Sequence, residues 1–175
     1  MTTVSDVDPT QDGLRKPVLS LRGISKPFGA VSALTNVDLD VHAGEVVALV
    51  GDNGAGKSTL VKILAGVHQP TSGTIAFRGE HVVLSDPSTA LGLGIATVFQ
   101  DLALCDNLDV VGNLYRGREL LHRGAIDEVS MEKRARELLS TLSIRIPSVR
   151  IPIASLSGGQ RQVVAIARAL IGDPK

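Results

Sequence analysis

The pattern of apolar and polar residues predicts several strands. Residues 37–41 alternate apolar and acidic side chains, as in a strand with one exposed face. Residues 45–50 and 95–99 are apolar on both faces, which is typical of buried strands in a parallel sheet. Shorter strand signals lie at residues 18–24, and at 74–77 and 82–84 around a turn at 78–80. The strands are separated by helical patterns, which favours an α/β fold.

Apolar residues at helical spacing predict three longer helices. They fall at residues 58–67, at 131–142 and at 159–171. The second helix is amphipathic, with Glu132 and Arg136 paired on its exposed face, whereas the third is apolar nearly all round and should be mostly buried. Short helices are predicted after Ser85-Asp86-Pro87 and at residues 109–115.

Composition and charge narrow the class of protein. The 175 residues are 43% hydrophobic and 21% charged, which is globular, and 18 basic residues balance 18 acidic ones. No large positive field is available for nucleic acid, so no nucleic-acid partner is expected. Cys105, the only cysteine, excludes an intramolecular disulfide and fits a reduced cytosolic setting. Residues 1–16 are interpreted as a flexible polar tail, and every apolar run is shorter than the roughly 18 residues that span a membrane.

A glycine-rich loop with the sequence Gly51-Asp52-Asn53-Gly54-Ala55-Gly56-Lys57-Ser58 lies between a predicted strand and a predicted helix. Glycines allow successive backbone N–H groups to surround a phosphate, and the helix start adds a partial positive charge. The Lys57 ammonium would reach the β- and γ-phosphates, and the Ser58 hydroxyl would bind Mg²⁺. The alternative interpretation is a glycine turn before a helix. The motif alone does not separate a kinase, a GTPase, a DNA motor and a transport ATPase.

A second candidate anion site precedes the last helix, at Leu156-Ser157-Gly158-Gly159-Gln160. Ser157 is a good N-cap residue, and the two glycines would leave backbone N–H groups exposed. From the residues alone, an ordinary capped helix is the simpler interpretation.

Together, the loop and this pentapeptide resemble the ATP-binding cassette family over residues 18–175. The resemblance implies a P-loop NTPase with a RecA-like core sheet, an antiparallel β subdomain and an α-helical signature subdomain at about residues 101–160, within an incomplete nucleotide-binding domain at 17–175. It also implies a head-to-tail pair of such domains. ATP would lie between one copy's Gly51, Asn53, Gly54, Ala55, Gly56, Lys57, Ser58 and Thr59 and its partner's Ser157, Gly158, Gly159 and Gln160.

Two single residues gain a role from the same resemblance. Gln100 resembles the glutamine that contacts Mg²⁺ and the attacking water and relays nucleotide state. The resemblance thus implies that Gln100 and Lys57 are catalytic and that Ser58 and Gln100 bind the metal. Phe28 resembles the aromatic residue that stacks on adenine. A surface amide and a packing phenylalanine are the alternatives. The four histidines show no metal-ligand spacing.

The sequences of residues 51–60 and 100–108 resemble those of the ATPases of ribose, xylose and fructose importers. This implies ATP hydrolysis coupled to monosaccharide uptake at the inner face of the cell membrane. The implied partners are a transmembrane permease subunit and, indirectly, a periplasmic or extracellular sugar-binding protein. Val111-Gly112-Asn113 departs from the Glu-Asn pair expected beside the permease contact.

The family's Asp-Glu strand and switch histidine are not found, because the sequence stops at Lys175, where that strand would follow. We therefore expect the N-terminal piece of a cassette, with weak nucleotide binding, little hydrolysis and an uncovered sheet edge beside residues 46–50. A soluble cassette ATPase of translation or DNA repair and a non-catalytic nucleotide-binding fragment are the alternative functions.

Overall fold

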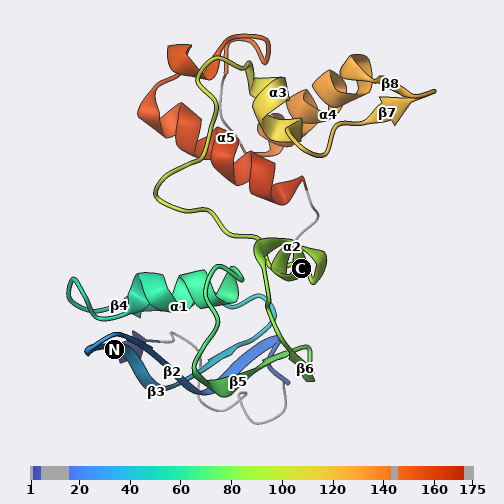
Figure 1. Cartoon of the computed structure of the whole chain (residues 1–175). Coiled ribbons are helices and arrows are strands. Elements are labelled where there is room, and N and C mark those ends of the chain that lie inside the picture. The colour runs from blue at the N-terminus through green and yellow to red at the C-terminus, as the bar shows by residue number, and fades with distance from the viewer. Residues whose placement is uncertain (1, 5–15, 143–145, 172–175) are drawn as a thin grey trace. The chain divides into compact units, whose positions relative to one another are not determined.

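The structure, a computed structural model, describes residues 2–4, 16–142 and 146–171 and divides into two compact units, Met1–Ile95 and Ala96–Lys175 (Figure 1). Residues 143–145, which follow the helix predicted at 131–142, lie outside the described residues. None of the helices within the described ranges is long and apolar enough to cross a membrane.

The first unit contains a four-stranded antiparallel sheet in the order β3-β2-β5-β6. Its strands are β2 (Leu19–Phe28), β3 (Val31–Val41), β5 (Ser72–Phe77) and β6 (Glu80–Val82). The alternation predicted for residues 37–41 is confirmed, since Leu39 is buried and Asp38 is exposed. β2 is longer than predicted because a register shift after Leu21 absorbs Gly23, whose φ is +63°, without ending the strand.

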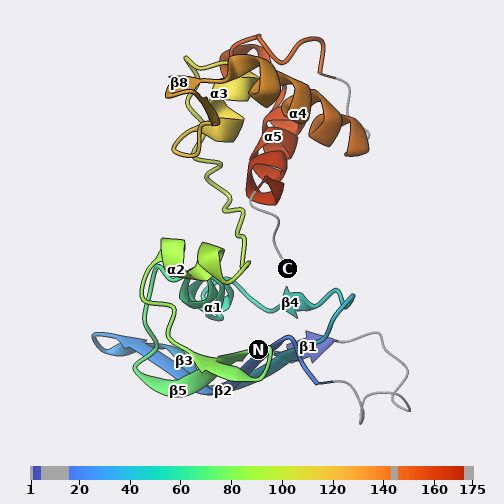
Figure 2. The same cartoon turned by 90° about the vertical axis from the view of Figure 1, so that its right-hand side faces the viewer.

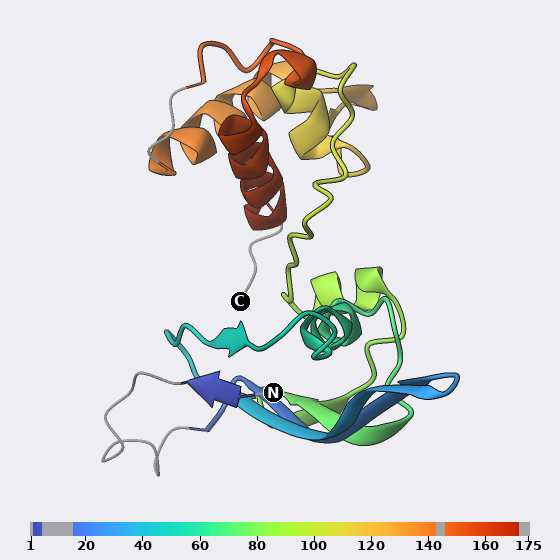
Figure 3. The same ribbon diagram turned by 90° about the vertical axis from the view of Figure 1, so that its left-hand side faces the viewer.

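Two helices cover one face of this sheet, as Figures 1, 2 and 3 show. They are α1 (Lys57–Leu64) and α2 (Pro87–Gly92). Asp86 caps α2 by accepting a hydrogen bond from the Thr89 N–H, and Pro87 occupies the first turn, as predicted. The buried side chains between the helices and the sheet form one apolar core: Leu21, Ile24, Leu34, Leu39, Leu60, Ile63, Ile75, Leu84 and Ala90.

The predicted buried strand at residues 45–50 is shorter and more exposed than expected. Only β4 (Ala48–Val50) is regular, and it pairs antiparallel with β1 (Thr2–Val4), so these residues of the predicted tail form a strand. Val46 is 90% exposed. In the described part of the chain no strand other than β1 pairs with β4, so the flanking apolar side chains have no sheet neighbours to bury them.

The second unit is mainly helical, with one small hairpin. Its elements are α3 (Val110–Tyr115), β7 (Leu121–His122), β8 (Ala125–Ile126), α4 (Glu128–Thr141), the 3-10 helix η1 (Ile153–Ser155) and α5 (Gly158–Leu170). The amphipathic helix predicted at 131–142 is confirmed as α4, which buries Met131, Ala135 and Leu139 and pairs Arg136 with Glu132 at 2.6 Å. These residues join α3 and α5 in a second apolar core.

Two predictions for this part of the chain are wrong. Residues 95–99 are not a strand, and Val98 and Phe99 are exposed, because no described strand lies alongside to supply ladder hydrogen bonds. Of the two strands predicted to be buried in a parallel sheet, at 45–50 and 95–99, the described residues contain only part of the first, β4. The last helix, α5, is amphipathic rather than buried all round: Val164 and Ala167 are buried, whereas Ile166 and Leu170 are exposed.

Gly66, which follows α1, packs closely against Asp86, the N-cap of α2, and this contact can be tested. Its φ is +72°, and a Cβ atom there would lie 2.3 Å from the carbonyl oxygen of Asp86. Gly79 has a similar φ of +85° but no atom within 4 Å of an added Cβ. We expect Gly79→Ala to lower the free energy of unfolding by about 1 to 2 kcal/mol through backbone strain alone. Gly66→Ala should cost about 1 to 3 kcal/mol more because of the clash. Urea unfolding measures both, and equal losses would contradict the tight packing at Gly66.

Candidate functional site

The glycine-rich loop joins β4 to α1 and takes backbone conformations that favour glycine. Gly51, Gly54 and Gly56 have φ values of +147°, +89° and +83°. Gly56 is also pressed against β3, since a Cβ atom there would lie 2.2 Å from the Ala33 carbonyl oxygen and 2.7 Å from Leu34 Cδ2. Glycine at position 56 is therefore required both by its φ and by this contact.

The start of α1 has features of an anion site. Gly56 is its N-cap and offers no side-chain hydrogen bond, and the first turn contains no acidic residue. The N–H groups of this turn point along the helix axis and lack side-chain acceptors, and the helix dipole adds a partial positive charge. An anion at this end of α1 would satisfy both.

Lys57 adds a full positive charge to the same loop. Its Nζ donates hydrogen bonds to the carbonyl oxygens of Gly51, at 2.6 Å, and Asp52, at 2.7 Å. The loop also turns back on itself through a bond from the Ala55 N–H to the Asp52 carbonyl. The ammonium thus lies against the loop and within reach of any group that the loop surrounds.

The residues at this loop fit Mg²⁺ bound together with a phosphate better than Mg²⁺ alone. Ser58 is exposed and its hydroxyl could be one ligand, and Thr59 is partly buried beside it. Among the described residues, no three His, Cys, Asp or Glu side chains gather where they could hold a metal ion. A metal at Ser58 would therefore take most of its oxygen ligands from phosphate and water.

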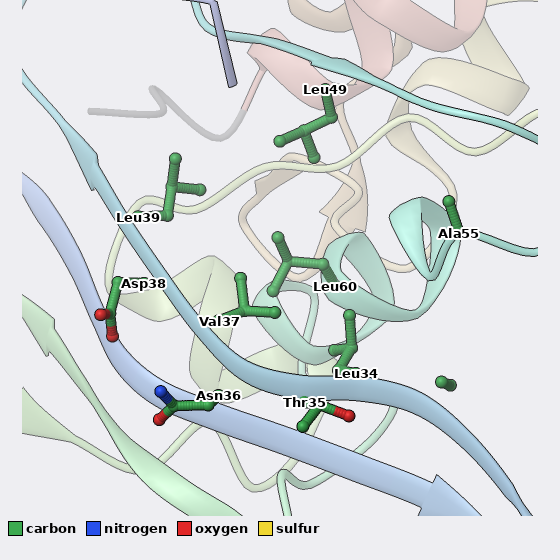
Figure 4. A pocket seen from close by; sticks show the side chains of 10 residues that line it. Leu34, Thr35, Asn36, Val37, Asp38, Leu39, Leu49, Ala55 and Leu60 are labelled. Carbon is green, nitrogen blue, oxygen red and sulfur yellow. The ribbon is translucent and has the colours of Figure 1, made fainter. Parts of the chain in front are cut away.

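A pocket of about 320 Å³ lies beside the loop, between β3, β4 and α1 (Figure 4). Val37 and Leu39 of β3 point toward Leu60 of α1, whereas Asn36 and Asp38 point to the other side of the strand. The pocket lining includes no lysine or arginine. Val37, Leu39 and Leu60 line it and belong to the apolar core or pack against it, and Ala55 of the glycine-rich loop is also part of its lining.

Phe28 ends β2 and belongs to the same unit as the loop. It is 43% exposed, and the His68 ring packs edge-on against it with 5.3 Å between ring centroids. Lys26 Nζ lies 5.5 Å from the centre of the Phe28 ring. Phe28 is thus a partly exposed aromatic ring at the surface, outside the apolar core of the sheet.

The pentapeptide at 156–160 forms the capped start of α5 in the second unit. Ser157 Oγ accepts a hydrogen bond from the Gln160 N–H at 3.3 Å, and Gln160 Oε1 accepts one from the Ser157 N–H at 3.0 Å. This capping box confirms the predicted N-cap. Gly158 and Gly159 are exposed, and no atom lies within 4 Å of a Cβ added to either. Their backbone is therefore accessible to a ligand.

Gln100 is exposed and lies in a bend that follows residues 95–99, which have no regular secondary structure. It belongs to the same unit as Ser157, whereas the glycine-rich loop and Phe28 belong to the other unit. The predicted site residues are thus divided between the two units.

Asn113 organises the loop after Gln100, a role that the sequence analysis missed. Its side chain is buried, with 1% exposed, and its Oδ1 accepts a hydrogen bond from the Cys105 N–H at 2.7 Å. Its Nδ2 donates to the carbonyl oxygens of Cys105, at 2.9 Å, and Asp109, at 3.0 Å. The available signal was a polar residue on the apolar face of a predicted helix, which requires polar partners inside the protein.

Val111-Gly112-Asn113 differs from the Glu-Asn pair expected there, and the structure gives a reason for the glycine at position 112. Asp109 caps α3 and its Oδ1 accepts a hydrogen bond from the Gly112 N–H at 2.6 Å. A Cβ atom at position 112 would lie 3.1 Å from that oxygen. Glycine allows the cap to close tightly, whereas a larger side chain would require the Asp109 carboxylate to move.

A strand, a glycine-rich loop and an uncapped helix that begins with lysine define a P-loop protein that binds nucleoside triphosphates. The sequence profile of the ABC transporter family matches residues 34–175, which include both this loop and the pentapeptide. The chain belongs to the ABC transporter family, and its fold is that of an α/β P-loop NTPase.

Three relatives with established names are similar to this chain. It is 46% identical to the xylose/arabinose import ATP-binding protein XylG of Sulfolobus acidocaldarius, over 90% of this chain and 63% of that protein. It is 40% identical to the fructose import ATP-binding protein FrcA of Rhizobium meliloti, over 89% of this chain and 63% of that protein. It is 44% identical to the ribose import ATP-binding protein RbsA 1 of Rubrobacter xylanophilus, over 89% of this chain and 31% of that protein. The chain therefore spans less than two thirds of the length of these relatives.

Solved structures agree with this assignment. An ATP-binding cassette of an ABC transporter superposes with a TM-score of 0.80 at 28% identity, over 91% of this chain and 67% of that one. A cassette solved as a dimer in a post-hydrolysis state with ADP and Pi gives a TM-score of 0.72 at 30% identity, over 89% and 70%. The likeness covers both units of the chain.

The role of Asn113 can be tested by removing its amide. Asn113→Ala leaves the Cys105 N–H and carbonyl without their partner, and we expect it to lower the free energy of unfolding by about 2 to 4 kcal/mol. Asn107→Ala, an exposed change in the same loop, should cost less than about 0.5 kcal/mol. Urea unfolding followed by circular dichroism compares the two variants, and a similar small loss for both would show that Asn113 does not hold the loop.

Proposed function

We propose that this chain is the ATP-binding part of an ABC importer subunit, which couples ATP binding and hydrolysis to the uptake of a monosaccharide. The observation that carries the proposal is the loop at 51–56, whose helix start lacks a side-chain cap and whose Lys57 adds a positive charge. The names of the relatives support sugar import rather than translation or DNA repair. A location at the cytoplasmic face of the membrane, beside a permease subunit, follows from this proposal.

In this proposal the loop holds the phosphates of ATP. The N–H groups of Gly54, Gly56 and Lys57 surround the β-phosphate, and the Lys57 ammonium exchanges its two carbonyl acceptors for β- and γ-phosphate oxygens. Because phosphate oxygens are charged, this exchange replaces two neutral hydrogen bonds by stronger charge-assisted ones. The remaining loop residues Gly51, Asn53, Ala55 and Thr59 shape the cradle.

The metal and the reacting water involve other residues. Mg²⁺ would neutralise charge on the β- and γ-phosphates, and Ser58 and Gln100 would hold it. Gln100 is exposed and uncharged, which suits a residue that orients water rather than removes its proton. Phe28 offers one aromatic face on which adenine can stack.

The start of α5 would complete the ATP site of a second, facing domain. Its accessible Gly158 and Gly159 N–H groups and the Ser157 hydroxyl would bind the γ-phosphate, while Gln160 fixes Ser157. Because each unit of one chain carries one of the two anion-binding helix starts, a head-to-tail pair of domains would use both at each site. ATP would then hold two domains together, and its loss would release them and shift the attached permease between conformations. A sugar-binding protein outside the cell would supply the sugar.

Replacement of Lys57 tests the nucleotide site. Lys57→Ala removes the charge that faces the phosphates, and we expect ATP to bind at least about 10-fold more weakly. Lys62→Ala removes an exposed lysine from the last turn of the same helix and should leave affinity unchanged within about twofold. Titration calorimetry with the whole chain measures both, and equal affinities for the two variants would contradict the proposal.

The metal can be tested separately. If Ser58 supplies a ligand to Mg²⁺, the unchanged chain should bind ATP more tightly with Mg²⁺ than with EDTA. Ser58→Ala should reduce this difference, while affinity in EDTA stays the same. A Mg²⁺ effect that is as large in Ser58→Ala as in the unchanged chain would remove Ser58 from the metal site.

A further inference from the structure

Arg161, the residue directly after the pentapeptide, bonds to three acceptors from two separate segments. Its Nε donates to the Leu156 carbonyl at 3.2 Å and its Nη2 to the Ala154 carbonyl at 3.0 Å. Its Nη1 pairs with Asp106 Oδ1 at 3.4 Å. Asp106 belongs to the loop that follows Gln100, so one guanidinium group joins this loop to the segment that leads into α5.

The bond to Leu156 has a particular consequence, because the Leu156 carbonyl and the Ser157 N–H belong to the same peptide group. Arg161 holds the carbonyl edge of that peptide, and Gln160 Oε1 holds the N–H edge at 3.0 Å. Rotation of the peptide would break both bonds. Its orientation determines where the Ser157 hydroxyl and the first N–H groups of α5 point.

Backbone bonds tie the same two segments together. The Ile153 N–H donates to the Leu108 carbonyl at 3.0 Å, and the Ala154 N–H donates to the Asp106 carbonyl at 3.3 Å. Asn113 holds the beginning of the loop through Cys105. The loop at 105–108 and the segment at 153–156 are therefore held together by backbone and side-chain hydrogen bonds.

The ion pair alone would contribute little, because the Asp106 side chain is 67% exposed and water screens it. The contribution of Arg161 is geometric. Its planar fork satisfies three acceptors at fixed angles, whereas a lysine at this position presents a single flexible ammonium.

We propose that Arg161 is a positioning residue: it fixes the Leu156–Ser157 peptide, and hence the N–H groups offered by Gly158 and Gly159, and it links that orientation to the loop after Gln100. The link to ATP rests on the proposed function above. In that setting a movement of the loop after Gln100 reaches the γ-phosphate-binding end of α5 through Asp106 and Arg161.

Amide hydrogen exchange of the whole chain, followed by NMR, tests the proposal. Arg161→Gln should speed exchange of the Ser157 and Gln160 amides about 5- to 10-fold, the factor expected for the loss of roughly one hydrogen bond. Arg161→Lys should give a smaller increase, because it restores the charge but not the fork. The matched control is Arg136→Gln, which breaks the exposed 2.6 Å pair with Glu132 on α4 and should leave those amides unchanged.

A double-mutant cycle tests the link to the loop. Asp106→Asn should speed the same two amides about twofold on its own and should add nothing in the Arg161→Gln background, because both changes break one connection. Additive effects would show that Asp106 acts independently of Arg161. Unchanged exchange at Ser157 and Gln160 in Arg161→Gln, or an equal acceleration along α4, would overturn the positioning role and leave a merely structural one.

Titration of ATP into the same variants separates this inference from the proposed function. At chain concentrations too low for pairing, ATP would contact only the loop 51–58, which belongs to the other unit, so its affinity should be the same in Arg161→Gln and in the unchanged chain. If ATP binds but exchange does not respond to Arg161→Gln, the positioning role fails and the proposed function stands. If exchange responds as expected but ATP binds to neither protein, the proposed function fails and the positioning of the peptide stands.

Discussion

The glycine-rich loop depends on one close contact, the approach of Gly56 to the backbone of β3 at Ala33. No side chain fits between them, so the N-cap residue of α1 is held directly against the sheet. Leu60 and Ile63, one and two turns further along, are fully buried in the core below. This contact therefore sets where the helix begins, which N–H groups are left open and how far the Lys57 ammonium reaches.

The two candidate anion sites differ in whether a side chain caps the first N–H groups of the helix. α1 begins at a glycine that supplies no acceptor, and its stability comes from the buried leucine and isoleucine on its lower face. α5 begins at Ser157, whose capping box satisfies the first donors and leaves two accessible glycines. The uncapped start of α1 leaves its N–H groups open to an anion. The capped start of α5 is held in place, and its two accessible glycines can contact an anion.

Features that depend on near neighbours in sequence were predictable, and features that depend on distant partners were not. The amphipathic helix α4, the caps at Asp86 and Ser157 and the loop before Lys57 each follow from residues within one or two turns. The apolar run at 95–99 needed adjacent strands, which the described residues do not provide. Asn113 was missed because the loop carbonyls it binds could not be placed beside it from the sequence.

The Asn113 amide also constrains how the sequence of this loop can change in evolution. It bonds to both backbone groups of Cys105 and to the carbonyl of Asp109, so these bonds require a fixed number of residues between them. Side chains in this loop can be exchanged while these hydrogen bonds persist, because the bonds are made to the backbone. A single inserted or deleted residue would move a carbonyl away from the amide, so this loop tolerates substitution far better than a change in length.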